Sequence, residues 1–287
     1  MIVIIGCVVV LGAVLTGFTL AGGHVGALIQ PSEFVTIGGA ALGALIVMSP
    51  KKVLVDLIRG MIQSVKGTPY NKVAYEDLFK LMYDLLRLAR HDGLVALESH
   101  VTQPQESAIF TKYPRLLKNH HVMEFICGAF SLIIEGTAKP EQLPGLLEAD
   151  IELIEEEHHG PLGVLTKTAD ALPGFGIVAA VLGIVVTMAS IDGPVEQVGE
   201  HVGAALVGTF LGILLSYGFF GPLAVRMEFL VAAELAYFRT VAAIIQGNEF
   251  PPKVSIEQAR RGVPTDVRPS RERMDELFAE VDSPPSN

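Results

Sequence analysis

The sequence predicts an all-α integral membrane protein with four transmembrane helices, a helical cytoplasmic domain between spans two and three, and a helical C-terminal tail. Three observations support this fold class. Of the 287 residues, 50% are hydrophobic and only 18% are charged, against about 25% in an ordinary soluble domain. Four long segments contain no Asp, Glu, Lys or Arg, which is typical of membrane spans. The polar segments between them show the helical spacing of apolar residues.

The charge-free segments place the four spans at residues 2–22, 34–50, 171–190 and 202–225. A helix of about 20 residues rises about 30 Å, enough to cross the hydrocarbon core. The second span is short and crosses only with snorkelling flanks or local thinning of the bilayer. The first span lacks a basic start and a cleavage site, which favours a retained anchor over a signal peptide. We expect domains at residues 1–50, 51–170, 171–225 and 226–287.

The distribution of Lys and Arg predicts the orientation. The loops at residues 23–33 and 191–201 contain neither residue. Basic residues instead flank the opposite ends of the spans: Lys51, Lys52, Arg59, Lys167 and Arg226. Because cytoplasmic loops carry an excess of Lys and Arg, we expect a multi-pass protein with both termini in the cytoplasm.

Amphipathic spacing predicts helices in the polar segments. Those between spans two and three are expected at residues 73–91, 94–101, 122–135 and 141–157, with Gly93 as a helix C-cap. His159-Gly160-Pro161 is interpreted as a helix end. Residues 224–246 continue the fourth span, short helices follow at 256–261 and 272–281, and residues 283–287 are expected to be disordered.

The composition excludes several classes of function. We find no P-loop, G-x-S-x-G or H-E-x-x-H motif, so no enzyme and no cofactor is expected. A net charge of −10 disfavours binding to nucleic acid. Cys7 and Cys127 are too isolated for a disulfide framework. The run from Glu155 to His159 raises the alternative of a metal site, but adjacent histidines point to different sides of a helix.

The spans as drawn contain hydroxyl groups but no Asp, Glu, Lys, Arg or His. Proton relays in membranes need titratable groups. If this protein moves ions, a partner must therefore supply the titrating carboxylate. The alternative is that the hydroxyl groups only bond to carbonyl groups of their own helices. They belong to Thr16, Thr19, Thr36, Thr187, Thr209, Ser216 and Tyr217.

Small residues and two prolines mark the spans. Gly39 with Gly43, and Gly208 with Gly212, have the G-x-x-x-G spacing that allows close packing of helices. Pro173 opens the third span and either kinks it or sits in its first turn. Pro222 falls near the end of the fourth span, where the helical pattern continues, so we expect a hinge there.

Four stretches of the chain resemble the MotA family of flagellar stator subunits: residues 22–46, 88–98, 170–188 and 205–224. The resemblance runs through nearly the whole chain in order. It implies a pentameric ring around two single-span MotB chains in the bacterial inner membrane. MotB would supply the carboxylate, and ion flow would turn the ring against the rotor protein FliG.

The resemblance also assigns roles to residues. It implies that Arg90 and Glu98 contact FliG and that Pro173 and Pro222 couple ion flow to movement. Thr209 would lie beside the MotB carboxylate, with Ala180 and Thr187 also lining the channel. Sodium-driven relatives carry a hydroxyl group where this chain has Ala180, so the resemblance favours protons as the transported ion.

Three alternatives remain open at this stage. An ExbB/TolQ-type energiser would have two spans similar to the last two of this chain. Such proteins, however, usually have three spans and lack the motif at residues 88–98. A transporter or membrane enzyme would need polar groups at the membrane midplane. A passive scaffold would not need hydroxyl groups such as that of Thr209.

Overall fold

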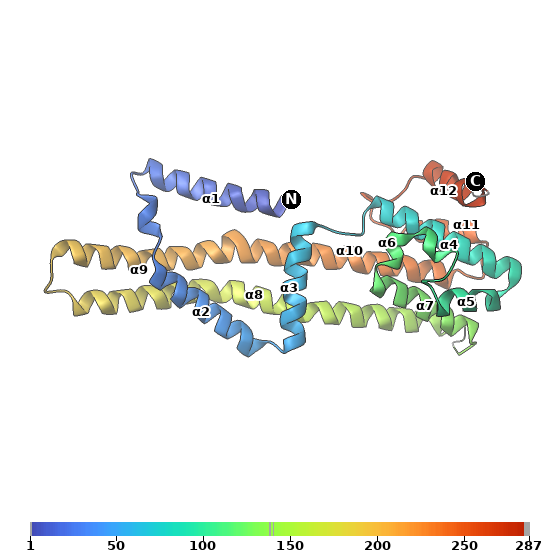
Figure 1. Ribbon diagram of the computed structural model, residues 1–287, viewed down its shortest axis with the longest axis horizontal. Helices are drawn as coiled ribbons and strands as arrows, with labels where there is room; N and C mark the ends of the chain where they lie inside the picture. Colours follow the sequence, from blue (N-terminus) through green and yellow to red (C-terminus); the bar gives the residue numbers. More distant parts are fainter. Residues whose placement is uncertain (1, 138, 140, 284–287) are drawn as a thin grey trace. The chain divides into compact units, whose positions relative to one another are not determined.

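The computed structural model describes residues 2–137, 139 and 141–283, and these residues form helices, turns and loops. Four helical segments are long and apolar enough to cross a membrane, which confirms the predicted fold class. The chain divides into two compact units (Figure 1). We call Met1–Gly67 with Glu157–Leu230 the membrane unit, and Thr68–Glu156 with Val231–Asn287 the polar unit.

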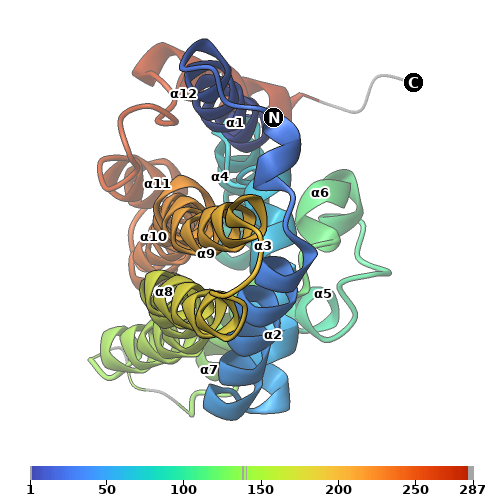
Figure 2. The same ribbon diagram turned by 90° about the vertical axis from the view of Figure 1, so that its left-hand side faces the viewer.

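The membrane unit contains the four spans and one amphipathic helix. Its elements are α1 (Ile2–Leu20), η1 (Val25–Leu28), α2 (Pro31–Met48), α3 (Lys51–Lys66), the later part of α8 (Leu143–Ala189), α9 (Val195–Leu215), a π-helical turn labelled η4 (Ser216–Phe220), and the start of α10 (Gly221–Gln246). In Figure 1 and Figure 2, α8 and α9 run side by side.

Two spans begin earlier than the charge pattern predicts. α2 begins at Pro31 because proline suits the first helical position, where an N–H group has no partner anyway. α9 begins at Val195, after Pro194. Glu33 is therefore inside the second membrane helix, and the prediction that the spans contain no acidic residue is wrong.

The predicted helix end at His159-Gly160-Pro161 is also wrong. α8 continues from Leu143 to Ala189 with Pro161 and Pro173 inside it. An interior proline costs roughly 3 kcal/mol and one hydrogen bond, which packing on both sides can offset. Gly160 packs close to Val53 of α3, and Leu165 is completely buried, so tertiary contacts hold the helix through Pro161.

The polar unit is a helical cluster with helical structure in every predicted range. Residues 94–101, however, form a 3₁₀ turn followed by a short α-helix, and the run at 141–157 is the beginning of a longer helix. It contains α4 (Lys72–Asp92), η2 (Leu94–Leu97), α5 (Glu98–Thr102), η3 (Phe110–Lys112), α6 (Pro114–Leu117), α7 (His120–Ile134), the beginning of α8, the end of α10, α11 (Pro252–Arg260) and α12 (Arg271–Asp282). Side chains of Asn71, Asn119 and Ser270 cap α4, α7 and α12. Gly93 ends α4 with a φ of 88°, as its predicted role requires. The expected disorder covers residues 283–287. It is wrong for Ser283, which ends α12 and donates a 2.8 Å hydrogen bond to the carbonyl oxygen of Ala279. Residues 284–287 lie outside the described residues.

Aromatic side chains fill the core of the polar unit. Tyr75, Phe79, Phe238 and Tyr237 are almost completely buried. Burial raises the pKa of Tyr75 to about 12, so its hydroxyl group stays protonated. α12 is tied to α4 by ion pairs along its length, namely Arg273 to Glu76 at 3.0 Å, Lys80 to Glu280, and Arg87 to Asp282 at 2.6 Å.

Candidate functional site

The membrane helices α8 and α9 approach so closely that their backbones are in contact. A Cβ on Gly212 would lie 2.6 Å from the carbonyl oxygen of Leu172, and one on Gly176 would lie 2.9 Å from that of Gly208. Only glycine fits at these positions, as the spacing of Gly208 and Gly212 predicts. The same spacing at Gly39 and Gly43 marks no contact within the described part of the chain. We call the contact between α8 and α9 the glycine seam.

The glycine seam carries two of the predicted channel residues. Thr209 is half-buried on α9, and its Cα lies 3.3 Å from the point where a Cβ of Gly176 would stand. Ala180 is half-buried on α8, one turn after Gly176. The structure therefore brings Thr209 and Ala180 to one pair of helices, on neighbouring turns of the same seam.

Thr187 lies on α8 but its hydroxyl group is already engaged. The side chain is buried and donates a 2.8 Å hydrogen bond to the carbonyl oxygen of Gly183, one turn earlier. Thr19 and Thr36 bond in the same way to Thr16 and Ser32. These bonds agree with the alternative in which the hydroxyl groups of the spans bond only to carbonyl groups of their own helices. No such bond is formed by the Thr209 hydroxyl group among the described residues.

The two prolines have different surroundings. Pro173 lies deep inside α8, so the alternative that it occupies a first helical turn is wrong. Its neighbour Leu172 presents the carbonyl oxygen that meets Gly212. Pro222 follows the π-helical turn, whose wide hydrogen bond runs from the Gly221 N–H to the Ser216 carbonyl oxygen. Sequence reasoning located Pro222 but missed this turn, because a π-turn has no sequence signature of its own.

Glu33 is the residue that sequence reasoning missed. It lies in the first turn of α2 and is 5% exposed. Its Oε2 atom has no hydrogen-bond partner among the described residues and contacts Gly208 of the glycine seam. Pro31 was the available signal, because a proline at the first helical position moves the start of α2 ahead of Glu33.

Arg90 and Glu98 lie in the polar unit, on either side of one sharp turn. α4 ends after Arg90, Gly93 reverses the chain, and α5 begins at Glu98. Both side chains are exposed, and neither forms an ion pair with a described residue. The buried Leu97 anchors the turn between them. The structure therefore presents a positive and a negative side chain together on one exposed turn.

A buried ionic cluster supports the end of α4. Asp84 is 4% exposed and accepts hydrogen bonds from Lys112 at 3.1 Å and from Tyr113 at 3.3 Å. Burial, together with the neighbouring Asp84 carboxylate, raises the pKa of Tyr113 well above its usual range. The Tyr113 hydroxyl group therefore remains a donor. This network fixes α4 two turns before Arg90.

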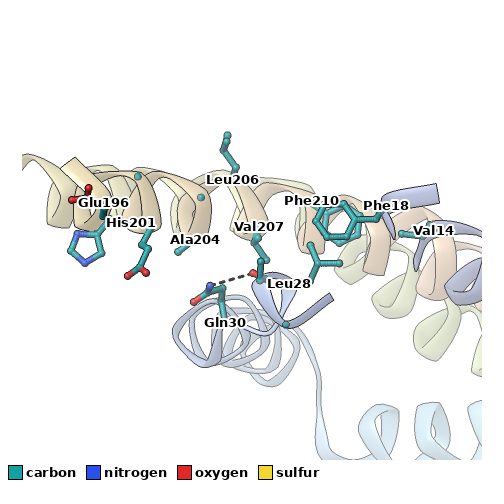
Figure 3. A pocket seen from close by; sticks show the side chains of 15 residues that line it. Val14, Phe18, Leu28, Gln30, Glu196, His201, Ala204, Leu206, Val207 and Phe210 are labelled. Carbon is teal, nitrogen blue, oxygen red and sulfur yellow. Dashed lines mark hydrogen bonds between the residues drawn. The ribbon is translucent and has the colours of Figure 1, made fainter. Parts of the chain in front are cut away.

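A cavity of about 1060 Å³ lies between α1, η1 and α9 (Figure 3). Phe18 and Phe210 line one end and Glu196 and His201 the other, and Glu200 also lines the cavity. Gln30 lines the same cavity and is held by a 3.2 Å hydrogen bond to the carbonyl oxygen of Ala27. Within the described ranges, no three His, Cys, Asp or Glu side chains are grouped to hold a metal ion.

Comparison with known families defines the class of protein first. Residues 115–240 match the MotA/TolQ/ExbB proton channel family, and residues 4–93 match the motility protein A N-terminal family. The fold thus belongs to a class of membrane proteins built for ion conduction, which is not an enzyme family.

Close relatives narrow the class to one family. The chain is 36% identical to motility protein A of Salmonella typhimurium, over 99% of this chain and 97% of the relative. It is 38% identical to chemotaxis protein LafT of Vibrio parahaemolyticus, over 96% and 98% of the two chains. The chain belongs to the motility protein A family, which confirms the resemblance.

Solved structures share the fold. The C. jejuni MotAB structure has a TM-score of 0.75 at 21% identity and covers 94% of this chain and 98% of that one. The flagellar MotAB stator complex from Bacillus subtilis has a TM-score of 0.73, also at 21% identity, and covers 95% and 98%. This agreement over nearly the full length favours the stator fold over the shorter ExbB/TolQ-type alternative.

Proposed function

We propose that this chain is the ring-forming subunit of a flagellar stator, which conducts ions together with a MotB-type partner and exerts torque on the rotor protein FliG. The observation that carries the proposal is the glycine seam. It places Thr209 and Ala180 on neighbouring turns, and residues 171–191 and 202–225 contain no acidic or basic side chain. The two helices of the seam thus have no titratable group of their own beside Thr209, and Glu33 of α2 reaches the seam only at Gly208. We therefore expect another chain to supply the titrating carboxylate of the conducting path.

The partner's single span is expected to supply that carboxylate beside Thr209. The names of the similar solved structures support such a partner, since both are MotAB assemblies. A hydroxyl group that its own helix does not use is free to bond a carboxylate. A pentamer of this chain around two partner chains would place five copies of Thr209 around the path, as the family resemblance implies.

Protons are the proposed ion, and no resident cofactor is needed. A dehydrated sodium ion requires several oxygen ligands, whereas a proton requires only the carboxylate. Ala180 offers no oxygen atom in its side chain. Thr187 is the nearest alternative on the same helix, and its hydroxyl hydrogen is already donated to Gly183.

The complex would transmit torque to FliG through contacts of Arg90 and Glu98. Their exposure on one turn allows both to pair with opposite charges on FliG. Such contacts act through long-range complementarity and weaken with salt. We place the ring in the bacterial inner membrane with both termini in the cytoplasm, because the Lys and Arg residues flank the spans on that side.

Swimming of a flagellated strain without stators tests the proposal. The strain would express this chain with its own MotB-type partner, and swimming would be measured across sodium concentrations at fixed ionic strength. Restored swimming that is insensitive to sodium supports a proton-driven stator. Sodium-dependent swimming would retain the stator and overturn the argument from Ala180. A membrane-inserted complex that never restores swimming would contradict the stator function and favour the ExbB/TolQ-type alternative.

A further inference from the structure

Glu33 is the only Asp, Glu, Lys or Arg residue before Lys51. It lies in the first turn of the membrane helix α2 and is 5% exposed within a single chain, so assembly can only bury it further. The hydroxyl group of the preceding Ser32 interacts with its carboxyl group. The Oε2 atom has no partner among the described residues. A membrane carboxyl group thus carries an unpaired oxygen atom at a buried position.

The unpaired oxygen contacts the glycine seam at Gly208. A Cβ on Gly208 would collide with Oε2 of Glu33 and would also lie 3.1 Å from the Cβ of Ala179. Gly208 precedes Thr209 directly. The contact between Glu33 and Gly208 therefore joins α2 to the segment of α9 that carries the proposed channel hydroxyl group.

The surroundings provide no counter-charge for an ionised Glu33. Neither α8 over residues 171–189 nor α9 over residues 202–215 has a titratable side chain. The first titratable groups of α9 are His201, seven residues before Gly208, and then Glu200 and Glu196. On the preceding segment, His24 is exposed. An unpaired buried carboxylate is strongly disfavoured, and the usual outcome is that the group takes up a proton.

A metal cation does not fit this position. A sodium ion needs several oxygen ligands, and the neighbours across the contact are glycine and alanine. A proton needs only the carboxyl group itself. We propose that Glu33 is a proton-binding site of this chain, separate from the partner's carboxylate, and that its bound proton keeps α2 packed on the segment of α9 that carries Thr209. This inference rests on the proposed stator function for its effect on torque.

The cavity of Figure 3 comes within one helical turn of this site. Gln30, one turn before Glu33, and Val207, next to Gly208, both line it. Glu196 and His201 line the other end (Figure 3). Through this cavity, the pH on the side of the loop between α8 and α9 sets the proton occupancy of Glu33. Loss of the proton leaves an uncompensated charge against α9 and loosens the contact.

Infrared spectroscopy of the purified complex with its partner tests the site without reference to swimming. An ordinary glutamate is ionised above about pH 5, so a band of a protonated carboxyl group at neutral pH marks an exceptional residue. We expect such a band in the wild type. Glu33→Gln should remove one component of it, seen in the difference spectrum against the wild type, while the partner's carboxyl group accounts for the remainder. The control Asp192→Asn, which removes an exposed carboxylate from the loop between α8 and α9, should leave the band unchanged. Identical spectra of wild type and Glu33→Gln would overturn the proposal.

A double-mutant cycle tests the contact. Gly208→Ala should lower the Tm of the complex, and the loss should shrink by at least half in a Glu33→Ala background, because the collision with Oε2 is gone. A residual loss from the Ala179 contact is expected. Gly39→Ala, which has open space around it, is the control. Equal losses in both backgrounds would overturn the contact.

Swimming as a function of external pH tests the effect on torque. Glu33→Gln mimics the protonated group, so it should swim at neutral pH and retain speed at alkaline pH, where the wild type slows. Parallel alkaline profiles for the two would overturn the regulatory role. If neither chain swims while the infrared band and the cycle behave as expected, the proton site stands and the stator function fails.

Discussion

Gly221 donates its backbone N–H to the carbonyl oxygen of Ser216, five residues earlier. This wide turn lies immediately before Pro222, which has no N–H to donate and whose ring would crowd the preceding turn of an ordinary α-helix. π-helical turns inside longer helices are frequent at functional sites. The pairing of a π-turn with Pro222 marks the place where the fourth span departs from regular helix.

Replacing Pro222 with alanine should change stability and torque in opposite directions. Alanine restores an N–H and removes the ring, so the complex should gain about 1–3 kcal/mol in stability. Torque should fall because the irregular turn is no longer enforced. The measurements are the Tm of the purified complex and swimming speed, with Pro194→Ala, outside α9, as the control. A variant with raised Tm and normal swimming speed would contradict the proposal of a hinge at Pro222.

Reversal of the exposed charge pair should weaken rotor engagement. Arg90→Glu and Glu98→Lys each turn an attraction into a repulsion, and exposed pairs of this kind contribute about 0.2–1 kcal/mol. We expect a roughly two- to fivefold loss of stators engaged per motor, stronger at low ionic strength. Counting stators in motile cells provides the measurement. Lys118→Glu and Glu106→Lys, exposed residues of the same unit, are the controls; losses equal to theirs would contradict the contact assignment.

Removing the Thr209 hydroxyl group should reduce torque without affecting assembly. Valine has nearly the same shape, so the glycine seam should remain closed, but the hydroxyl group that we propose to bond the partner's carboxylate is lost. Thr36→Val is the matched control, because the Thr36 hydroxyl group is bonded to the carbonyl oxygen of Ser32 at 2.9 Å. Co-purification with the partner and swimming speed are measured together. Normal speed in Thr209→Val would exclude this residue from the ion path.

Asp282 should help to fix the turn that carries Arg90 and Glu98. It pairs with Arg87 at 2.6 Å and accepts a 3.2 Å hydrogen bond from Tyr83, one and two turns before Arg90. Asp282→Asn should cost only about 1 kcal/mol or less, since both partners of the ion pair are about half exposed. Hydrogen exchange at the end of α4 should accelerate. Unchanged exchange there would show that α12 does not hold α4.

The fold was largely predictable because membrane spans and amphipathic helices leave one-dimensional signals. The charge-free runs and the C-cap Gly93 each act locally. The helix end predicted at Pro161 was wrong because packing around Gly160 and Leu165 outweighs the local effect of the proline. Such packing involves residues far apart in the sequence and leaves no local signal.

The candidate site was predictable in part. Gly208 and Gly212 form the seam, yet Gly39 and Gly43 have the same spacing without a contact, so spacing alone does not select partners. Glu33 was missed because its position depends on where α2 begins. The engagement of Thr187 by Gly183 could only be seen once rotamers were known.

The most direct measurement follows the rotation of a bead on a single motor in cells without stators, while this chain and its partner are induced together. The stator account predicts that speed returns in discrete equal steps. It also predicts that no step appears when the membrane carboxylate of the partner is replaced by an amide, although the complex still assembles. Steps that persist with the amide variant, or an assembled wild-type complex that never produces a step, would contradict the account.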